Sequence, residues 1–167
     1  PVMIYIHGGR NTGGWSYEPN YHGEQLAKQG MVVVSVAYRL GIFGWLNHPD
    51  MSIKNPALHD LAVGLAWVHE HIAAFGGDPD RITVAGESAG AGNAINLAIS
   101  PLSQGRVRRL IHQSGAWSFD ESPSAQAAEK QALDFQQALV GETGSLAVLR
   151  DIPAMQLLDA ASQTYAN

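Results

Sequence analysis

Residues 75–90 read F-G-G-D-P-D-R-I-T-V-A-G-E-S-A-G, and this stretch decides the fold that the rest of the sequence supports. A short β-branched run begins at Ile82, and the motif G-x-S-x-G follows at once around Ser88. In a sharp turn from strand to helix, side chains flanking the serine would clash with neighbouring backbone, which explains the two glycines. Such a turn exposes the serine hydroxyl and directs the next backbone N–H, that of Ala89, to the same point. The pattern predicts a nucleophilic serine.

A second glycine loop gives the motif its context, because five residues in a chain with 18 glycines are weakly specific by themselves. The apolar run at 2–6 leads directly into His7-Gly8-Gly9-Arg10. Functional loops of parallel sheets lie at the carboxyl ends of the strands. We therefore expect this loop and the serine turn to converge.

Strand-like and helix-like patterns alternate along the chain, which is typical of an α/β fold with a mostly parallel sheet. The runs that favour strands are continuously apolar or β-branched, and those at 2–6 and 31–37 look buried on both faces. The helical segments show apolar residues at steps of three and four. Strands are expected at 2–6, 31–37, 82–85 and 109–113, helices at 22–29, 57–74, 89–99, 125–139, 145–150 and 154–161, and an irregular stretch at 41–56.

The composition disfavours several other classes of protein. Hydrophobic residues make up 46% and charged residues 15% of the 167 residues, which suits one globular domain. A net charge of −5 without any basic run argues against nucleic-acid binding. The lack of cysteine excludes disulfides and thiolate chemistry, and no membrane span or secretory signal is visible. The absence of cysteines and of N-x-S/T sequons suits a bacterial protein. It is expected to be either cytoplasmic or secreted without disulfides, and the cytoplasm is slightly favoured.

Several segments together resemble the type-B carboxylesterase family, the α/β-hydrolases that include the cholinesterases. The resemblance covers essentially the whole chain in the family's order. It implies the α/β-hydrolase fold, a central and mostly parallel sheet flanked by helices, and a serine esterase that acts on small-molecule esters without metal or cofactor. The matching segments are P-V-M-I-Y-I-H-G-G at 1–9, V-V-V-S-V-A-Y-R-L-G-I-F-G-W-L at 32–46, A-W-V-H-E-H-I-A-A-F-G-G-D-P at 66–79, the elbow at 86–90, H-Q-S-G at 112–115 and L-R-D-I-P at 149–153.

The resemblance also implies the role of each site residue. Ser88 would attack the ester carbonyl and form an acyl-enzyme that water then releases. The backbone N–H groups of Gly9, Arg10 and Ala89 would form the oxyanion hole, in which donors meet a charge that exists only in the transition state.

Four further residues resemble supporting groups of the family. Glu87 and Ser114 look like the pair that supports the catalytic histidine from behind. Arg39 and Asp60 look like a buried ion pair that joins the irregular stretch to the long helix, the alternative being plain surface charge. In a buried pair, removal of one partner costs roughly 3–5 kcal/mol because the other charge is left uncompensated.

The chain departs from the family at Arg10, where a third glycine is usual. A backbone N–H survives this change, so the oxyanion hole need not be lost. We expect the guanidinium either to reach the acyl or alcohol pocket and favour anionic or polar esters, or to lie in solvent.

The base and the acid of the triad are not recognisable in the sequence. His112 is the only histidine after Ser88 and lies in a strand pattern, where packing in the sheet is its expected role. His7 is expected to fix the glycine loop by hydrogen bonding. Asp120 and Glu121 follow the fourth strand, where some α/β-hydrolases carry their acid, but the resemblance places acid and histidine beyond residue 167.

Residues 1–167 are therefore expected to form the central part of one α/β-hydrolase catalytic domain, an incomplete fragment without a second domain and with little turnover alone. Two alternatives stay open: a non-catalytic binding module of the same fold, and an esterase like hormone-sensitive lipase, which also carries an H-G-G loop. Trp117 and Phe119 either line the substrate pocket or pack in the core. The sequence indicates neither the ester nor the oligomeric state.

Overall fold

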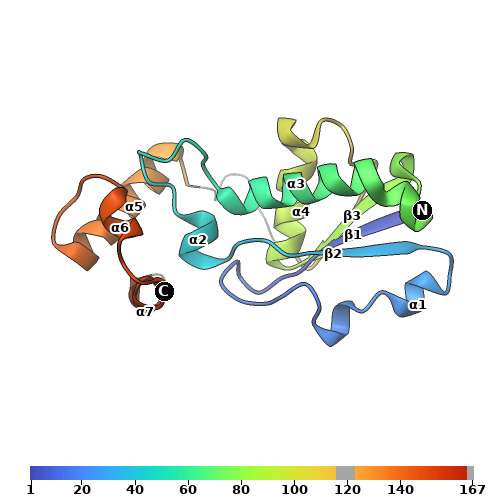
Figure 1. Cartoon of the computed structure of the whole chain (residues 1–167), viewed down its shortest axis with the longest axis horizontal. Helices are drawn as coiled ribbons and strands as arrows, with labels where there is room; N and C mark the ends of the chain where they lie inside the picture. Colours follow the sequence, from blue (N-terminus) through green and yellow to red (C-terminus); the bar gives the residue numbers. More distant parts are fainter. Residues whose placement is uncertain (116–122, 165–167) are drawn as a thin grey trace. The chain divides into compact units, whose positions relative to one another are not determined.

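The computed structural model describes residues 1–115 and 123–164 (Figure 1). They form two compact units, each of which is described by itself. Unit 1 contains residues 1–38 and 57–115, and unit 2 contains residues 39–56 and 123–164.

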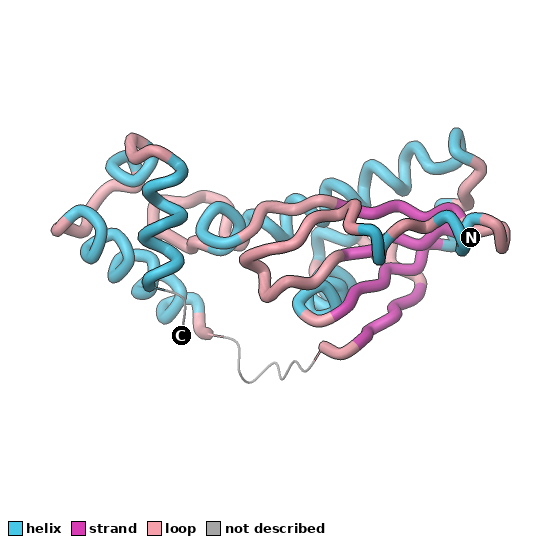
Figure 2. The backbone as a smooth tube through the Cα atoms, turned by 90° about the horizontal axis from the view of Figure 1, so that it is seen from below, coloured by secondary structure: helices cyan, strands magenta, loops and turns pink. Residues whose placement is uncertain are grey.

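Unit 1 is built on a four-stranded parallel sheet, seen as neighbouring strands in Figure 2. The strands are β1 (Val2–Ile6), β2 (Val32–Val36), β3 (Ile82–Glu87) and β4 (Arg109–Gln113), in the spatial order β2-β1-β3-β4. Ile6 at the end of β1 is in register with both Val36 and Gly86. The loops after β1 and β3 therefore leave the sheet at the same edge, as the sequence predicts.

The described strands differ in burial according to their place in the sheet. Val2, Ile4 and Ile6 of β1 are buried, as are Ile82 and Val84 of β3. β2 is half-buried along its whole length and β4 is exposed, because each lies at an edge of this sheet. The prediction that both of the first two strands are buried on both faces is therefore wrong for β2.

Helices flank the sheet where the periodicity indicates them. The long helix α3 (Pro56–His71) starts with a proline, whose missing N–H is not needed there. It buries Leu61, Leu65 and Val68 and continues as a 3₁₀ turn, η2 (Ile72–Phe75), that ends at Gly76 with φ 80°. The other elements are α1 (Glu24–Ala27), α4 (Ala89–Ile99) and the 3₁₀ turns η1 (Pro19–Tyr21), η3 (Pro79–Arg81) and η4 (Pro101–Ser103).

Unit 2 is helical, with α2 (Gly41–Trp45), α5 (Ala125–Val140), α6 (Ala147–Arg150) and α7 (Ala154–Thr164). Helix α2 corrects the expectation of an irregular stretch at 41–56, since five residues with two glycines give too short a pattern to reveal a helix. Buried side chains from all four helices meet in one cluster, made of Ile42, Phe135, Leu149 and Leu157.

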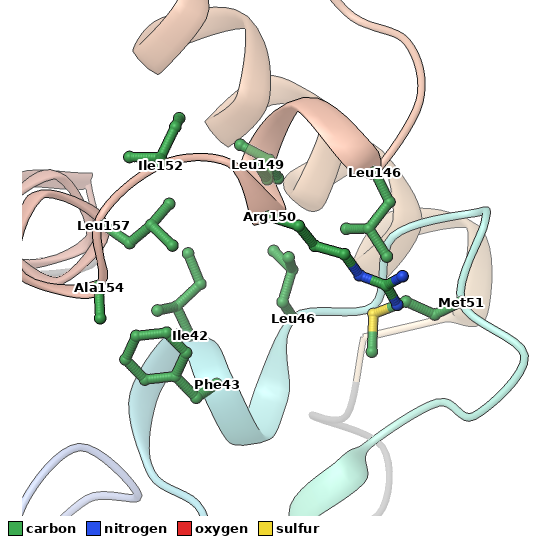
Figure 3. Close-up of a pocket in the computed structure, with 10 residues that line it drawn as sticks. All are labelled: Ile42, Phe43, Leu46, Met51, Leu146, Leu149, Arg150, Ile152, Ala154 and Leu157. Carbon is green, nitrogen blue, oxygen red and sulfur yellow. The ribbon is translucent and has the colours of Figure 1, made fainter.

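An apolar hollow of about 440 Å³ lies beside this cluster in unit 2 (Figure 3). Ile42, Phe43 and Leu46 of α2 line it together with residues of α6 and α7. Among the described residues that line it, only Arg150 is charged, and none of them is a serine, a histidine or a carboxylate. The hollow therefore lacks the groups that nucleophilic catalysis requires.

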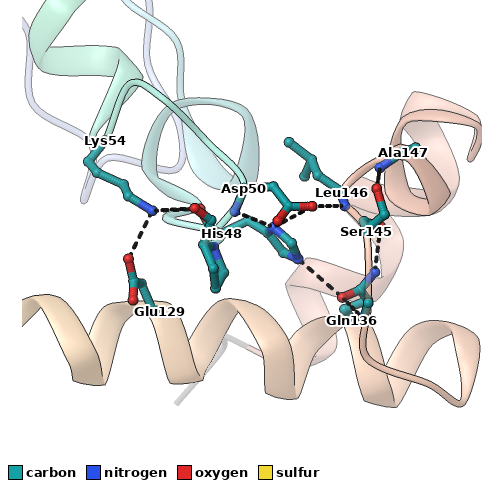
Figure 4. A network of polar contacts seen from close by, with 10 residues as sticks. His48, Asp50, Lys54, Glu129, Gln136, Ser145, Leu146 and Ala147 are labelled. Carbon is teal, nitrogen blue, oxygen red and sulfur yellow. Dashed lines mark hydrogen bonds and ion pairs between the residues drawn. The ribbon is translucent and has the colours of Figure 1, made fainter.

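A network of polar contacts also holds unit 2 together (Figure 4). The Gln136 side chain is fully buried, and its amide donates to the Ser145 carbonyl at 3.0 Å. Its Oε1 accepts from the Gly144 N–H at 3.1 Å and lies 3.2 Å from Nε2 of the buried His48. Lys54 donates to the His48 carbonyl at 2.7 Å. The network ties the loop after α2 to α5, and its buried groups are satisfied by hydrogen bonds, as burial of polar groups requires.

Candidate active site

Ser88 occupies a strained turn between β3 and α4. Its backbone has φ 55° and ψ −124°, outside the regions that ordinary residues adopt. The Ser88 N–H donates to the Gln113 carbonyl at 2.9 Å, and the Ser88 carbonyl accepts from the N–H of Ala91 at 3.0 Å. The side chain is half-buried and makes no capping hydrogen bond. This is the conformation that the G-x-S-x-G pattern predicts.

The two glycines of the motif allow close approach of backbone segments. A Cβ at Gly86 would overlap the Gly90 carbonyl. A Cβ at Gly90 would overlap the Ile6 carbonyl oxygen and lie 2.6 Å from that of His7. The predicted steric reason for both glycines is confirmed, and the start of α4 packs directly on the end of β1.

The glycine loop after β1 meets the turn around Ser88. A Cβ placed on Gly8 would lie 3.2 Å from the Ser88 Cβ and 2.8 Å from the Glu87 carbonyl oxygen. Gly8 is buried, whereas Gly9 and Arg10 are exposed. The predicted convergence of the two loops is confirmed, because the Gly8 backbone of the glycine loop lies against Ser88 of the serine turn.

After Gly8 the loop forms a turn in which the backbone N–H groups of Gly9 and Arg10 remain available as hydrogen-bond donors. Gly9 has φ 107°, and its carbonyl accepts from the N–H groups of both Thr12 and Gly13 at 3.0 Å. Arg10 has φ 58°, the left-handed region that glycine favours. Within residues 1–115 and 123–164, no hydrogen bond uses the N–H of Gly9 or Arg10. Ala89 opens α4, so its N–H has no acceptor within the helix.

His7 and Tyr38 support the loop from inside unit 1. The buried His7 has its Nδ1 2.8 Å from the Gly8 carbonyl oxygen, which confirms the expected hydrogen bond. The Tyr38 hydroxyl donates to the His7 carbonyl at 2.8 Å, and the two rings stack with centroids 4.5 Å apart. Burial raises the pKa of Tyr38 from 10.0 to about 12, although a hydrogen bond from Asn93 lowers it in part.

This raised pKa predicts an alkaline loss of stability that depends on Tyr38. The folded state holds the phenolic proton more tightly, so the contribution is complete below pH 10.0 and disappears as the pH rises towards about 12. Tyr38→Phe is expected to reduce this loss by about 2–3 kcal/mol, at about 1.36 kcal/mol per pKa unit. Urea unfolding of both proteins at pH 8 and pH 12 measures the difference. The exposed Tyr17 supplies the control Tyr17→Phe, and equal alkaline losses in wild type and Tyr38→Phe would contradict the prediction.

The residues expected to support the catalytic histidine lie beside the turn. The Glu87 carboxylate faces the Gly8 backbone, since its Oε2 would be 2.9 Å from a Cβ there. Ser114 follows β4, is exposed and has φ 52°. His112 lies in β4 as predicted, but its side chain is exposed, and its ring faces Gly115. His112 is therefore not buried by packing in the sheet, which was its expected role.

Arg39 and the residues after β4 were also expected to contribute to the site. Arg39 Nη2 donates to the Pro56 carbonyl at 3.4 Å in unit 2, and its pairing with Asp60 stays a prediction. The further acid and pocket candidates, Trp117, Phe119, Asp120 and Glu121, lie outside the described residues.

Across the described ranges, no group of three or more His, Asp or Glu side chains could hold a metal ion. No described helix is both long and apolar enough to cross a membrane.

Sequence reasoning missed Asn93, which is 1% exposed in α4. Its Nδ2 donates to Oδ1 of Asn11 in the glycine loop at 2.8 Å. The available signal was weak, because Asn93 is one of two amides, with Asn96, in an otherwise small and apolar helix, A-G-A-G-N-A-I-N-L-A-I, that follows Ser88. A buried amide needs a partner, and here the partner is the loop itself.

The comparison with protein families agrees with this arrangement of strand, turn and glycine loop. The model described as "Carboxylesterase family" matches residues 1–167. This chain belongs to the carboxylesterase family. Its parallel sheet flanked by helices is that of the α/β-hydrolase esterases.

Individual carboxylesterases resemble the chain throughout its length. It is 41% identical to the para-nitrobenzyl esterase of Bacillus subtilis (strain 168), over 98% of this chain and 34% of the relative. It is 38% identical to the fumonisin B1 esterase of Sphingopyxis macrogoltabida, over 98% of this chain and 29% of that protein. A solved para-nitrobenzyl esterase structure superposes with a TM-score of 0.88 at 41% identity, over 99% of this chain and 34% of that one. The chain thus spans about a third of the length of these relatives.

Proposed function

We propose that this chain is part of a serine carboxylic-ester hydrolase in which Ser88 is the nucleophile. The observation that carries the proposal is the approach of Gly8 to Ser88, with 3.2 Å between a Cβ built on Gly8 and the Ser88 Cβ. It brings the serine turn and the donor loop together. Membership of a family of ester hydrolases supports the same reaction.

In the proposed reaction the Ser88 hydroxyl oxygen bonds to the ester carbonyl carbon while a base takes its proton. The carbonyl electron pair moves onto oxygen, and the N–H groups of Gly9, Arg10 and Ala89 stabilise the resulting oxyanion. Removal of one such donor typically lowers kcat by about 10²–10³-fold. When the intermediate collapses, the base returns its proton to the leaving oxygen, the alcohol departs and an acyl-enzyme remains, which water cleaves by the same route.

The histidine base and its orienting acid are proposed to lie outside residues 1–167. Glu87 and Ser114 are proposed to support this catalytic histidine from behind. The two units are proposed to belong to one catalytic domain, of which this chain is the central part. The chain's span of about a third of its relatives supports this, and residues 1–167 alone are expected to show little turnover.

Covalent labelling tests the proposal directly. The full-length protein is treated with a fluorophosphonate, which reacts with activated serines, and the modified peptide is located by mass spectrometry. An adduct on Ser88 is expected, together with a burst of alcohol release from an activated ester. Absence of any adduct at Ser88 would favour the non-catalytic binding module instead.

We further propose that Arg10 favours anionic or polar esters. Its side chain is exposed, and the backbone N–H of the same residue is one of the proposed oxyanion donors. Arg10→Gly is expected to lower the rate ratio of anionic to neutral esters about fivefold, which is about 1 kcal/mol for a charge at about 4 Å in water. The same change is expected to raise stability by about 1 kcal/mol, because glycine tolerates the left-handed backbone. Matched ester pairs and urea unfolding measure the two effects.

Gln104 provides a matched control for the backbone effect of Arg10→Gly. It is exposed, has φ 50° and lies after η4. Gln104→Gly is expected to raise stability by a similar amount and leave the ester ratio unchanged. An unchanged ratio in Arg10→Gly would mean that the guanidinium does not face the ester.

A further inference from the structure

The proposed oxyanion loop contains two consecutive non-glycine residues in the left-handed region. Arg10 has φ 58° and Asn11 has φ 61°. L-residues other than glycine lose free energy in this conformation, asparagine less than most. Such strain persists only where surrounding contacts hold it, and it clusters at functional sites. Because Arg10 itself is exposed, the restraint has to come from its neighbours.

Two kinds of contact in unit 1 restrain these residues. The Gly9 carbonyl closes the turn by accepting from the Thr12 and Gly13 N–H groups at 3.0 Å, and a side-chain contact between Asn11 and Asn93 ties the turn to α4. Asn93 Nδ2 donates to Asn11 Oδ1 at 2.8 Å, across 82 positions of sequence. Asn93 is buried in α4, the helix that begins directly after Ser88. This hydrogen bond therefore joins the helix that carries the nucleophile to the loop that carries the donors.

The other side of the donor pair is held from inside unit 1. The Tyr38 hydroxyl donates to the His7 carbonyl at 2.8 Å. His7 Nδ1 in turn lies 2.8 Å from the Gly8 carbonyl oxygen. The loop is thus held at Gly8 and again at Asn11, on both sides of the Gly9 and Arg10 donors.

We propose that Asn93 and Asn11 are positioning residues that hold the N–H groups of Gly9 and Arg10 in the orientation that binds the oxyanion. This inference rests on the proposed serine-esterase function. The peptide between Arg10 and Asn11 is set by the backbone angles of both residues. If Asn11 is released, Arg10 can relax to negative φ, and the peptide planes on either side of it rotate away from Ser88.

The decisive variant is Asn11→Gly in the full-length protein. Glycine accepts the positive φ of position 11 but lacks the amide that Asn93 holds. We expect kcat to fall about 10–100-fold, because small displacements of catalytic groups have effects of this size. KM is expected to change less than twofold, and the inhibition constant of a trifluoromethyl ketone, which mimics the oxyanion, should rise by the same factor as kcat falls. A role in stability alone would lower neither kcat nor ketone affinity in the folded enzyme.

Asn93→Ala is expected to reproduce this pattern, and the double variant should lose little more than either single variant. Asn96→Ala in the same helix is the matched control, and its kcat should stay at the wild-type value. Since Asn11→Gly changes a half-buried loop residue, it keeps the test usable if Asn93→Ala does not fold. Wild-type kcat and ketone affinity in Asn11→Gly would overturn the inference. Failure of the proposed function would look different, because the wild type would then not be labelled at Ser88.

Discussion

Replacing Ser88 by alanine in the full-length protein is expected to lower kcat for ester hydrolysis by about 10⁶-fold, the size of effect seen when a triad serine is removed. The residual rate would come from the oxyanion donors and substrate binding. Burst-phase and steady-state kinetics with an activated ester measure this loss. Fluorophosphonate labelling should disappear at the same time, because no nucleophilic oxygen remains at the turn.

The same substitution is expected to leave the free energy of unfolding almost unchanged. Ser88 makes no capping hydrogen bond, and alanine has the same Cβ in the same positive-φ backbone. Ser124→Ala is the contrasting control, since Ser124 Oγ accepts from the Ala127 N–H at 3.2 Å at the start of α5. That variant should lose about 1 kcal/mol of stability and keep its kcat. Ser88→Ala with more than a hundredth of wild-type turnover would rule out Ser88 as the nucleophile.

Gly90→Ala is expected to destabilise the protein by about 3 kcal/mol or more, the upper range of overpacking effects. The added methyl group would overlap the Ile6 carbonyl oxygen and lie 2.6 Å from the His7 carbonyl oxygen. Both are backbone atoms of β1 and its loop, so no side-chain rotation relieves the contact. The midpoint and slope of urea unfolding measure the change.

Gly144→Ala is the matched control for Gly90→Ala. Nothing lies within 4 Å of a Cβ at Gly144, and its φ is not positive. This variant should stay within about 0.5 kcal/mol of the wild type, as surface substitutions usually do. Similar unfolding free energies for the two variants would contradict the tight packing of α4 on β1.

The sequence predicts most of the fold because its strongest signals are local. The β-branched run at Ile82, the two motif glycines and the loop after Ile6 each depend on neighbouring residues. Four strands and the long helices follow from periodicity, with ends that differ by a few residues. Helix α2 was missed because two glycines interrupt its single turn, and the half-burial of β2 follows from strand order, which periodicity does not encode.

The candidate site is predictable only in part, since part of it depends on contacts between distant positions. Ser88 and Gly9 follow from motifs, whereas the Asn11–Asn93 contact spans 82 positions and the Tyr38–His7 contact spans 31. One sequence contains no covariation that would reveal such pairs. The roles of Glu87, Ser114 and the Arg39–Asp60 pair remain predictions, because they involve groups or distances that the local patterns do not specify.

The close approach of Gly90 to the end of β1 also limits which positions of this chain can vary. In a mutant library, most substitutions at positions 8, 86 and 90 are expected to destabilise the protein, because any side chain there meets backbone atoms. Trp15 and Tyr17, by contrast, are 51% and 75% exposed on the segment that follows the glycine loop. Randomising these two aromatics would vary exposed side chains close to the glycine loop in sequence and leave the tightly packed backbone at positions 8, 86 and 90 unchanged.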